Sequence, residues 1–132
     1  MTIWYLTHYR SPLVRCYEPT GFVGGRRLPL DVRADDEAYV ITAAVPGLKP
    51  EGLKIEVLED VVTLRGQIPG ADEENDGYLM RELATGEFER SLRLPDPLDA
   101  SKAEASIEDG LLTLRIPKAE EARPKTVKLK AH

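Results

Sequence analysis

The chain has 132 residues, 42% hydrophobic and 31% charged, which is the size and composition of one folded domain with short extensions. Its net charge of −5 argues against a nucleic-acid binder, and no apolar run is long enough to cross a membrane. Met1 is followed by no secretory signal and Cys16 is the single cysteine, so we expect a cytoplasmic protein without an intramolecular disulfide.

The first 29 residues combine large apolar side chains with an excess of positive charge, and we expect them to form a flexible N-terminal arm. The large apolar residues are Trp4, Tyr5, Leu6, Tyr9, Leu13, Val14, Tyr17 and Phe22. They lie outside every predicted strand, and burying one such side chain is worth roughly 1.5–3 kcal/mol. We therefore expect them to be buried between subunits or against partner proteins. The alternative is that they fold back as an extra strand or cap of the same core.

Residues 30–118 carry the pattern of short β-strands separated by turns. An apolar run over residues 38–45 ends at Pro46-Gly47, and residues 53–57 alternate between apolar and charged side chains. The alternation returns in four later stretches, at residues 62–64 (ending at Gly66), 92–94, 103–107 and 112–116. Asp109-Gly110 is a strong hairpin signal before the last of these. Because no long amphipathic helix separates the strands, the sequence predicts an all-β, immunoglobulin-like antiparallel β-sandwich.

The connection between Gly66 and Glu87 is long for a compact sandwich. Residues 70–77 are acidic and lack large apolar side chains, which is typical of a solvated loop. They are followed by a segment with the composition of a short strand, formed by Tyr78, Leu79, Met80, Arg81, Glu82 and Leu83. A connection of this length usually has a functional reason, and a strand on a long arm can pair with another protomer.

Acidic residues are plentiful, but their spacing indicates neither a catalytic nor a metal site. The pairs Glu59-Asp60 and Glu108-Asp109 fall at predicted turns, where carboxylates normally face water rather than converge in a cleft. The two histidines lie near the termini, and no spacing of metal ligands occurs. The glycine-rich segment 21–27 lacks the Gly-Lys-Ser/Thr ending of a nucleotide-binding loop. We therefore expect no enzyme activity, no metal and no cofactor.

Residues 119–132 form a basic C-terminal extension with one apolar pair. Val127 and Leu129 alternate with lysines, so in an extended chain both side chains project from one face. Such a pair suits a hydrophobic groove on an acidic protein. The alternative is an ordinary edge strand of the chain's own domain.

Several segments, in this order, resemble the α-crystallin domain of the small heat-shock proteins of bacteria and plants. They are Pro46-Gly47-Leu48, Leu53–Val57, Val61–Gly66, Phe88-Glu89-Arg90-Ser91-Leu92-Arg93-Leu94-Pro95 and Ala105-Ser106-Ile107-Glu108-Asp109-Gly110-Leu111-Leu112. The resemblance covers residues 30–118, with the tail pair following at the expected place. It implies an ATP-independent holdase, which binds partly unfolded client proteins and prevents their aggregation.

The resemblance also implies how the chain assembles with itself. The dimer would form by exchange of the strand near Tyr78–Leu83, with Arg93 in an ion pair between protomers. Higher oligomers would form when the tail pair enters a groove of a neighbour lined by Leu53, Ile55, Val57, Ala103, Ala105 and Ile107. Val127 and Leu129 replace the commoner isoleucine pair, and the N-terminal arm is short for the family. A second hypothesis is a monomeric co-chaperone or adaptor built on a related sandwich.

Overall fold

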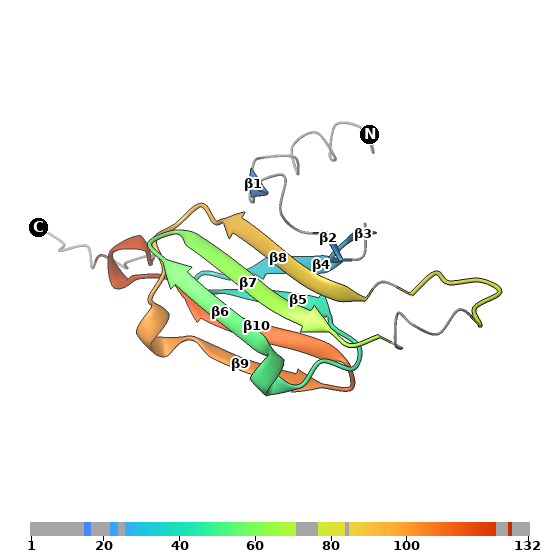
Figure 1. The fold of residues 1–132 in the computed structure, drawn as a ribbon. Coiled ribbons are helices and arrows are strands. Elements are labelled where there is room, and N and C mark those ends of the chain that lie inside the picture. Colours follow the sequence, from blue (N-terminus) through green and yellow to red (C-terminus); the bar gives the residue numbers. More distant parts are fainter. Residues whose placement is uncertain are drawn as a thin grey trace, which may run out of the picture.

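The computed structural model describes residues 15–16, 22–23, 26–70, 77–83, 85–123 and 127, with side chains described from Leu28 onward. Two four-stranded antiparallel sheets pack face to face (Figure 1). The first has the order β1-β8-β7-β6, formed by Arg15–Cys16, Gly86–Arg93, Val61–Ile68 and Leu53–Leu58. The second has the order β4-β5-β10-β9, formed by Leu30–Ala34, Ala38–Ala44, Leu111–Pro117 and Glu104–Glu108. The predicted β-sandwich is confirmed.

Short elements complete the described part of the chain. Strands β2 (Phe22–Val23) and β3 (Arg26–Arg27) form a small hairpin beside β8. Three 3-10 turns are η1 (Pro50–Gly52), η2 (Ala100–Lys102) and η3 (Glu120–Ala122). The described residues contain no α-helix, as the lack of a helical period in the sequence predicts.

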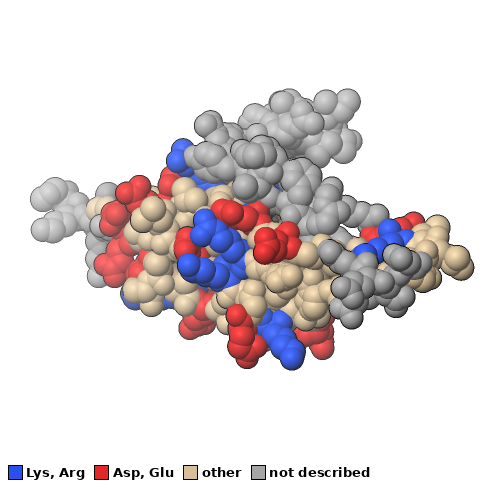
Figure 2. Space-filling model, viewed as in Figure 1, with Lys and Arg blue, Asp and Glu red and all other residues tan. Residues whose placement is uncertain are grey.

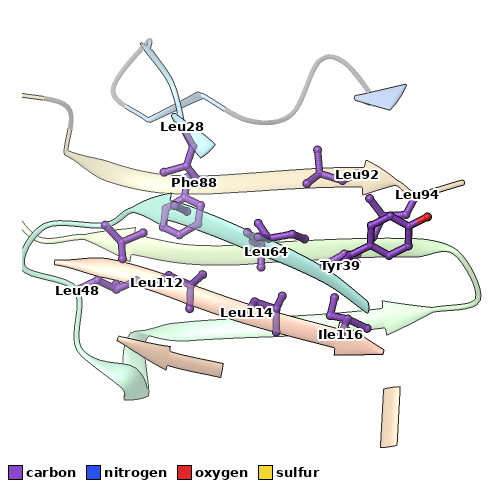
Figure 3. Packing of buried hydrophobic residues seen from close by; sticks show 14 of the residues in the cluster. Leu28, Tyr39, Leu48, Leu64, Phe88, Leu92, Leu94, Leu112, Leu114 and Ile116 are labelled. Carbon is purple, nitrogen blue, oxygen red and sulfur yellow. The ribbon is translucent and has the colours of Figure 1, made fainter. Parts of the chain in front are cut away.

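The alternating pattern of the sequence decides which side chains enter the core. In the β6–β7 hairpin, Ile55 lies opposite Leu64 and Val57 lies opposite Val62, and both β7 residues are fully buried. Directly opposite residues of an antiparallel pair share a face, so the apolar set of β6 also points inward. The core cluster joins both sheets, as Figure 3 shows for Leu64 of one sheet and Leu112, Leu114 and Ile116 of the other.

The hairpin predicted at Asp109-Gly110 is confirmed, and its backbone explains the sequence signal. Asp109 has φ of 50° and Gly110 has φ of 78°, so both central residues are in the left-handed region. A two-residue turn with positive φ at both positions matches the twist of the flanking strands. The turn connects β9 to β10 in register, with Glu108 opposite Leu111.

The end of a strand predicted at Gly66 is wrong, because β7 continues through this residue to Ile68. Gly66 pairs with Leu53 on one side and Phe88 on the other. A Cβ at this position would lie 2.8 Å from the Phe88 ring and 2.9 Å from the carbonyl oxygen of Gly52. The glycine therefore marks a close approach inside the strand rather than its end.

The N-terminal segment contributes to the sandwich over two residues. Arg15 pairs with Arg93 and Cys16 pairs with Leu92, so β1 adds to the edge of β8. This short pairing agrees with the alternative that part of the arm folds back as an extra strand. Phe22 lies in β2, whereas the other large apolar residues of the arm lie outside the part of the chain that the structure describes: Trp4, Tyr5, Leu6, Tyr9, Leu13, Val14 and Tyr17.

Candidate assembly and binding surfaces

The first candidate surface is the edge of the sandwich where β6 and β9 lie. Each is the last strand of its sheet, and Figure 1 shows both along the same long edge. On β6 the inward side chains are those of Leu53, Ile55 and Val57, all partly buried against the core. We call the inward-facing apolar residues of these two strands, which we expect from the sequence to line a groove, the β6–β9 groove.

The wall of the groove on β9 is made of smaller side chains. Ile107 lies opposite Leu112 and Ala105 lies opposite Leu114, so both face the core side of the sheet. Ala103 and Ile107 are partly buried, but Ala105 is exposed although it faces inward. The two sheets are therefore not closed over each other at Ala105. The register therefore places five of the six expected residues on the inward faces of β6 and β9, and Ala103 packs against the core just before β9.

Within the single chain, the β6–β9 groove does not cover Val127, the one residue of the tail pair that the structure describes. Val127 is 80% exposed, and Leu129 lies outside the described residues. The chain after β10 remains part of the sandwich as far as Arg123, because the Arg123 guanidinium Nε donates to the Lys118 carbonyl at 3.0 Å. Val127, the first apolar residue of the tail pair, lies four residues after Arg123 in the sequence.

The second candidate surface is the arm between β7 and β8. The described part of it, residues 77–83, lies beyond the ends of these strands in Figure 1 and forms no strand within the single chain. Leu79 is fully exposed, and Met80 and Leu83 are at least three-quarters exposed. Arg81 lies with its guanidinium carbon 5.0 Å from the centre of the Tyr78 ring. The arm therefore presents large apolar side chains to solvent in a segment that the core does not cover.

Arg93 is at the outer face of β8, where the sequence places it. Its Nε lies 3.8 Å from Oδ2 of Asp60 in the same chain, and both side chains are substantially exposed. An exposed pair at this distance contributes little to stability. The single chain thus contains an ion pair for Arg93 within the protomer, at the turn between β6 and β7.

Arg90 is a functional candidate that sequence reasoning missed. It is 6% exposed, the one charged residue buried among the described residues, and its Nη1 donates to the carbonyl oxygen of Leu28 at 2.6 Å. The contact joins β8 to the segment that leads from the N-terminal arm into β4. The sequence does contain a signal for the burial of Arg90. Phe88, Arg90 and Leu92 are two residues apart and therefore share one face of the strand, and that face is buried.

The outer face of the β6–β7–β8 sheet is polar and carries several ion pairs. Arg65 at its centre lies 2.9 Å from Glu89 on β8 and 3.6 Å from Glu56 on β6, and Lys54 lies 3.1 Å from Glu56. The neighbouring Lys54 lowers the pKa of the Glu56 carboxyl, and Glu89 raises the pKa of the Arg65 guanidinium. Figure 2 shows acidic and basic side chains interspersed on this face. It is therefore a solvated surface rather than a docking site for apolar segments.

The described part of the chain shows neither a metal site nor a membrane-spanning helix. Within the described residues, no three His, Cys, Asp or Glu side chains gather closely enough to hold a metal ion. Among the same residues, no helix has the length and apolar character needed to cross a membrane.

Comparison with known proteins gives a consistent family. A model of the Hsp20/alpha crystallin family matches residues 31–130. The 18 kDa antigen 2 of Mycobacterium avium is 36% identical over 110 residues, which cover 81% of this chain and 79% of that protein. The 18 kDa heat shock protein of Streptomyces albus G is 33% identical over 103 residues, 77% of this chain and 72% of that protein. The solved structure of hspA from Xanthomonas axonopodis has a TM-score of 0.64 at 27% identity, covering 69% of this chain and 92% of that chain.

Proposed function

Because the chain belongs to the Hsp20/alpha crystallin family, whose small heat-shock proteins are oligomeric chaperones and not enzymes, we propose that it is an ATP-independent holdase. It would bind partly unfolded proteins and keep them from aggregating under stress. The observation that supports this proposal is the exposure of Ala105, which faces inward on β9 next to the apolar residues that β6 packs against the core. An unfolding protein exposes extended apolar segments, and these are what such residues can bind.

The mechanism we propose is competition between self-burial and client burial. At rest, neighbouring subunits cover the groove and the apolar residues of the N-terminal arm. Heating weakens the contacts between subunits, and the uncovered surface then binds the exposed core of a client. The acidic centre of the chain, with 22 acidic against ten basic residues over residues 31–121, keeps the loaded complex in solution.

The dimer of this proposal forms by exchange of the arm. The segment Tyr78–Leu83 has exposed apolar side chains and no strand partner among the described residues of its own chain. Among the described strands β4 pairs with β5 alone, so its other edge can accept a strand from a second protomer. Addition there extends the sheet and buries Leu79, Met80 and Leu83. Arg93 would exchange Asp60 for an acidic residue of the partner.

Higher assembly would follow from docking of the tail. Val127 and Leu129 project from one face of an extended chain and match the apolar strip of the β6–β9 groove of a neighbour. The tail is basic, with four cations and no acid over residues 122–132, and the domain that it meets is acidic. Charge complementarity therefore favours the same contact. Valine in place of isoleucine removes one methylene, worth about 0.8 kcal/mol at most, which favours reversible docking.

The experiment that tests the proposal is light scattering of a heat-denatured client without ATP. We expect the full chain to suppress aggregation at roughly equal subunit ratios, whereas deletion of residues 1–20 leaves a folded dimer that suppresses it poorly. A truncated protein that protects the client as well as the full chain would show that the N-terminal arm is not a binding surface. A chain that is monomeric at all concentrations and gives no protection would instead support the adaptor hypothesis.

A further inference from the structure

The chain beyond β10 does not leave the domain where the strand ends. The Lys118 amide donates to the Glu37 carbonyl at 2.7 Å, and the Asp99 amide donates to the Pro117 carbonyl at 2.8 Å. Lys118 also forms an isolated antiparallel bridge with Leu98. These bonds tie Pro117 and Lys118, the last two residues before the C-terminal extension, to two separate loops, one before β5 and one after β8.

Side-chain contacts also hold Lys118 to the sandwich. The buried Tyr39 donates its hydroxyl hydrogen to the carboxylate of Asp96. The Lys118 ammonium lies 3.5 Å from the same carboxylate and 5.2 Å from the centre of the Tyr39 ring, and its side chain is largely buried. Burial, followed by the nearby Asp96, raises the pKa of the Tyr39 phenol, so the hydroxyl keeps its proton at neutral pH. We call Tyr39, Asp96 and Lys118 the root cluster.

The turn η3 then carries the fixed part of the chain to Arg123. Its Nε donates to the Lys118 carbonyl, and its amide donates to the Glu120 carbonyl at 3.2 Å. The Ala122 amide donates to the Ala119 carbonyl at 2.9 Å. Lys118 connects these contacts. Its side chain pairs with Asp96, its amide donates to the Glu37 carbonyl, and its carbonyl accepts from Arg123.

We propose that Asp96, Lys118 and Arg123 are positioning residues for the tail: they fix the point from which Val127 and Leu129 reach a neighbouring subunit. This inference rests on the tail docking proposed above. From Arg123 to Val127 the chain has four steps, which span at most about 14 Å. Released from the root cluster, the free chain would begin at Pro117 and have ten steps, with a reach of about 35 Å.

The difference in free length has a measurable consequence. The effective concentration of a tethered group falls roughly as the −3/2 power of tether length, so a tether of ten steps in place of four lowers it about fourfold. The short tether therefore strengthens docking to a neighbour at one particular distance. Loosening the root cluster weakens that docking and broadens the range of distances that the tail can reach.

The test uses the full-length oligomer and the variants Asp96→Asn and Lys118→Met. We expect subunit exchange, measured by fluorescence energy transfer between labelled populations, to be faster, by up to about fourfold for full release, and the mass distribution to be broader. Asp109→Asn is the matched control, since it makes the same change in the exposed turn at the far end of β10, where asparagine is equally suited to positive φ. It should leave exchange unchanged.

Combination with the tail variant Val127→Ala/Leu129→Ala separates positioning from simple stabilisation. If the root cluster acts through the tail, Asp96→Asn adds no further change once the tail pair is removed. Equal effects with and without the tail pair would overturn the inference, as would a lower Tm with unchanged exchange. A tail variant that itself leaves exchange and oligomer size unchanged would overturn the docking proposal instead.

A second variant avoids any damage to the fold. Insertion of Gly-Ser after Arg123 keeps the root cluster intact and lengthens the tether from four steps to six, so exchange should rise about twofold. An insertion that leaves exchange unchanged would show that tether length does not control docking. The inference would then fail even if the substitutions in the root cluster behaved as expected.

Discussion

Strand β6 and the arm segment Tyr78–Leu83 are both six residues long and rich in large apolar side chains, but they meet opposite environments. The inward residues of β6 are packed against the core, whereas Leu79 and Leu83 of the arm are almost wholly exposed. In β6 the apolar residues alternate with charged ones, and a two-residue turn leads directly to its partner β7. In the arm the apolar residues do not alternate, and the described residues include no strand beside them.

The contrast shows what local sequence can decide and what it leaves to a partner. Alternation together with a tight turn produces a strand whose apolar face is buried within one chain. Apolar residues carried on a long connection have no such neighbour, and their exposed surface is worth roughly 25 cal/mol per Å² when another molecule covers it. This is why we propose the arm as a surface for a second protomer, whereas β6 already has its partner β7 within the chain.

The largest expected effect is on the sandwich itself. Leu64 on β7 is fully buried between the sheets, so Leu64→Ala should lower the free energy of unfolding by about 2–5 kcal/mol, measured by chemical denaturation. The matched control is Leu58→Ala at the end of β6, where the same side chain is 74% exposed and the change should be below about 0.5 kcal/mol. Similar losses at both positions would show that burial does not distinguish them.

The parts of the fold that the sequence predicted are those with a local pattern. The groove residues of β6 and β9 were placed on one face by period-two alternation alone, and the register puts them on the core side. The hairpin at Asp109-Gly110 was predicted by two residues whose backbone preferences fit one turn type.

The parts that the sequence did not predict depend on contacts between distant residues. Arg90 was passed over because a charged residue is not expected on a buried face, and its partner is the carbonyl of Leu28, 62 residues earlier in the chain. The hydrogen bond from Tyr39 to Asp96 joins residues 57 positions apart. The sequence predicts the end of a strand at Gly66, because glycine usually interrupts a strand. The approach of the Phe88 ring, which explains this glycine, cannot be located from sequence.

A smaller effect is expected for the arm, and it should appear in association rather than in folding. Leu79→Ser/Leu83→Ser removes exposed side chains, so the free energy of unfolding of the sandwich should change by less than about 0.5 kcal/mol. If these residues are buried in the exchanged dimer, the dissociation constant should rise at least about tenfold, equal to 1.4 kcal/mol, in analytical ultracentrifugation.

Leu111→Ser is the matched control for the arm, since Leu111 is also exposed but lies on β10 outside the proposed contact. It should leave the dimer unchanged. Equal dissociation constants for the wild type and the arm variant would contradict strand exchange through residues 78–83. Loss of the dimer in the Leu111 variant as well would indicate that any exposed leucine supports association.

The smallest effect is expected on the outer face of the β6–β7–β8 sheet. Glu89→Gln replaces a carboxylate that lies 2.9 Å from Arg65, and both side chains are between a third and a half exposed. Water screens such a pair, so the loss of unfolding free energy should be below about 1 kcal/mol at low salt. Glu87→Gln, two residues earlier on the same face of β8, is the matched control.

Salt distinguishes an ion pair from a packing contact at this site. At 1 M salt the screening length falls to about 3 Å, so the difference between the Glu89 and Glu87 variants should disappear. A loss above about 2 kcal/mol that persists in salt would mean that Glu89 packs rather than pairs. The expected result would mean that the ion pairs of this face stay solvated and contribute little to stability, so that the assembly we propose rests on the apolar residues of the β6–β9 groove and of the arm.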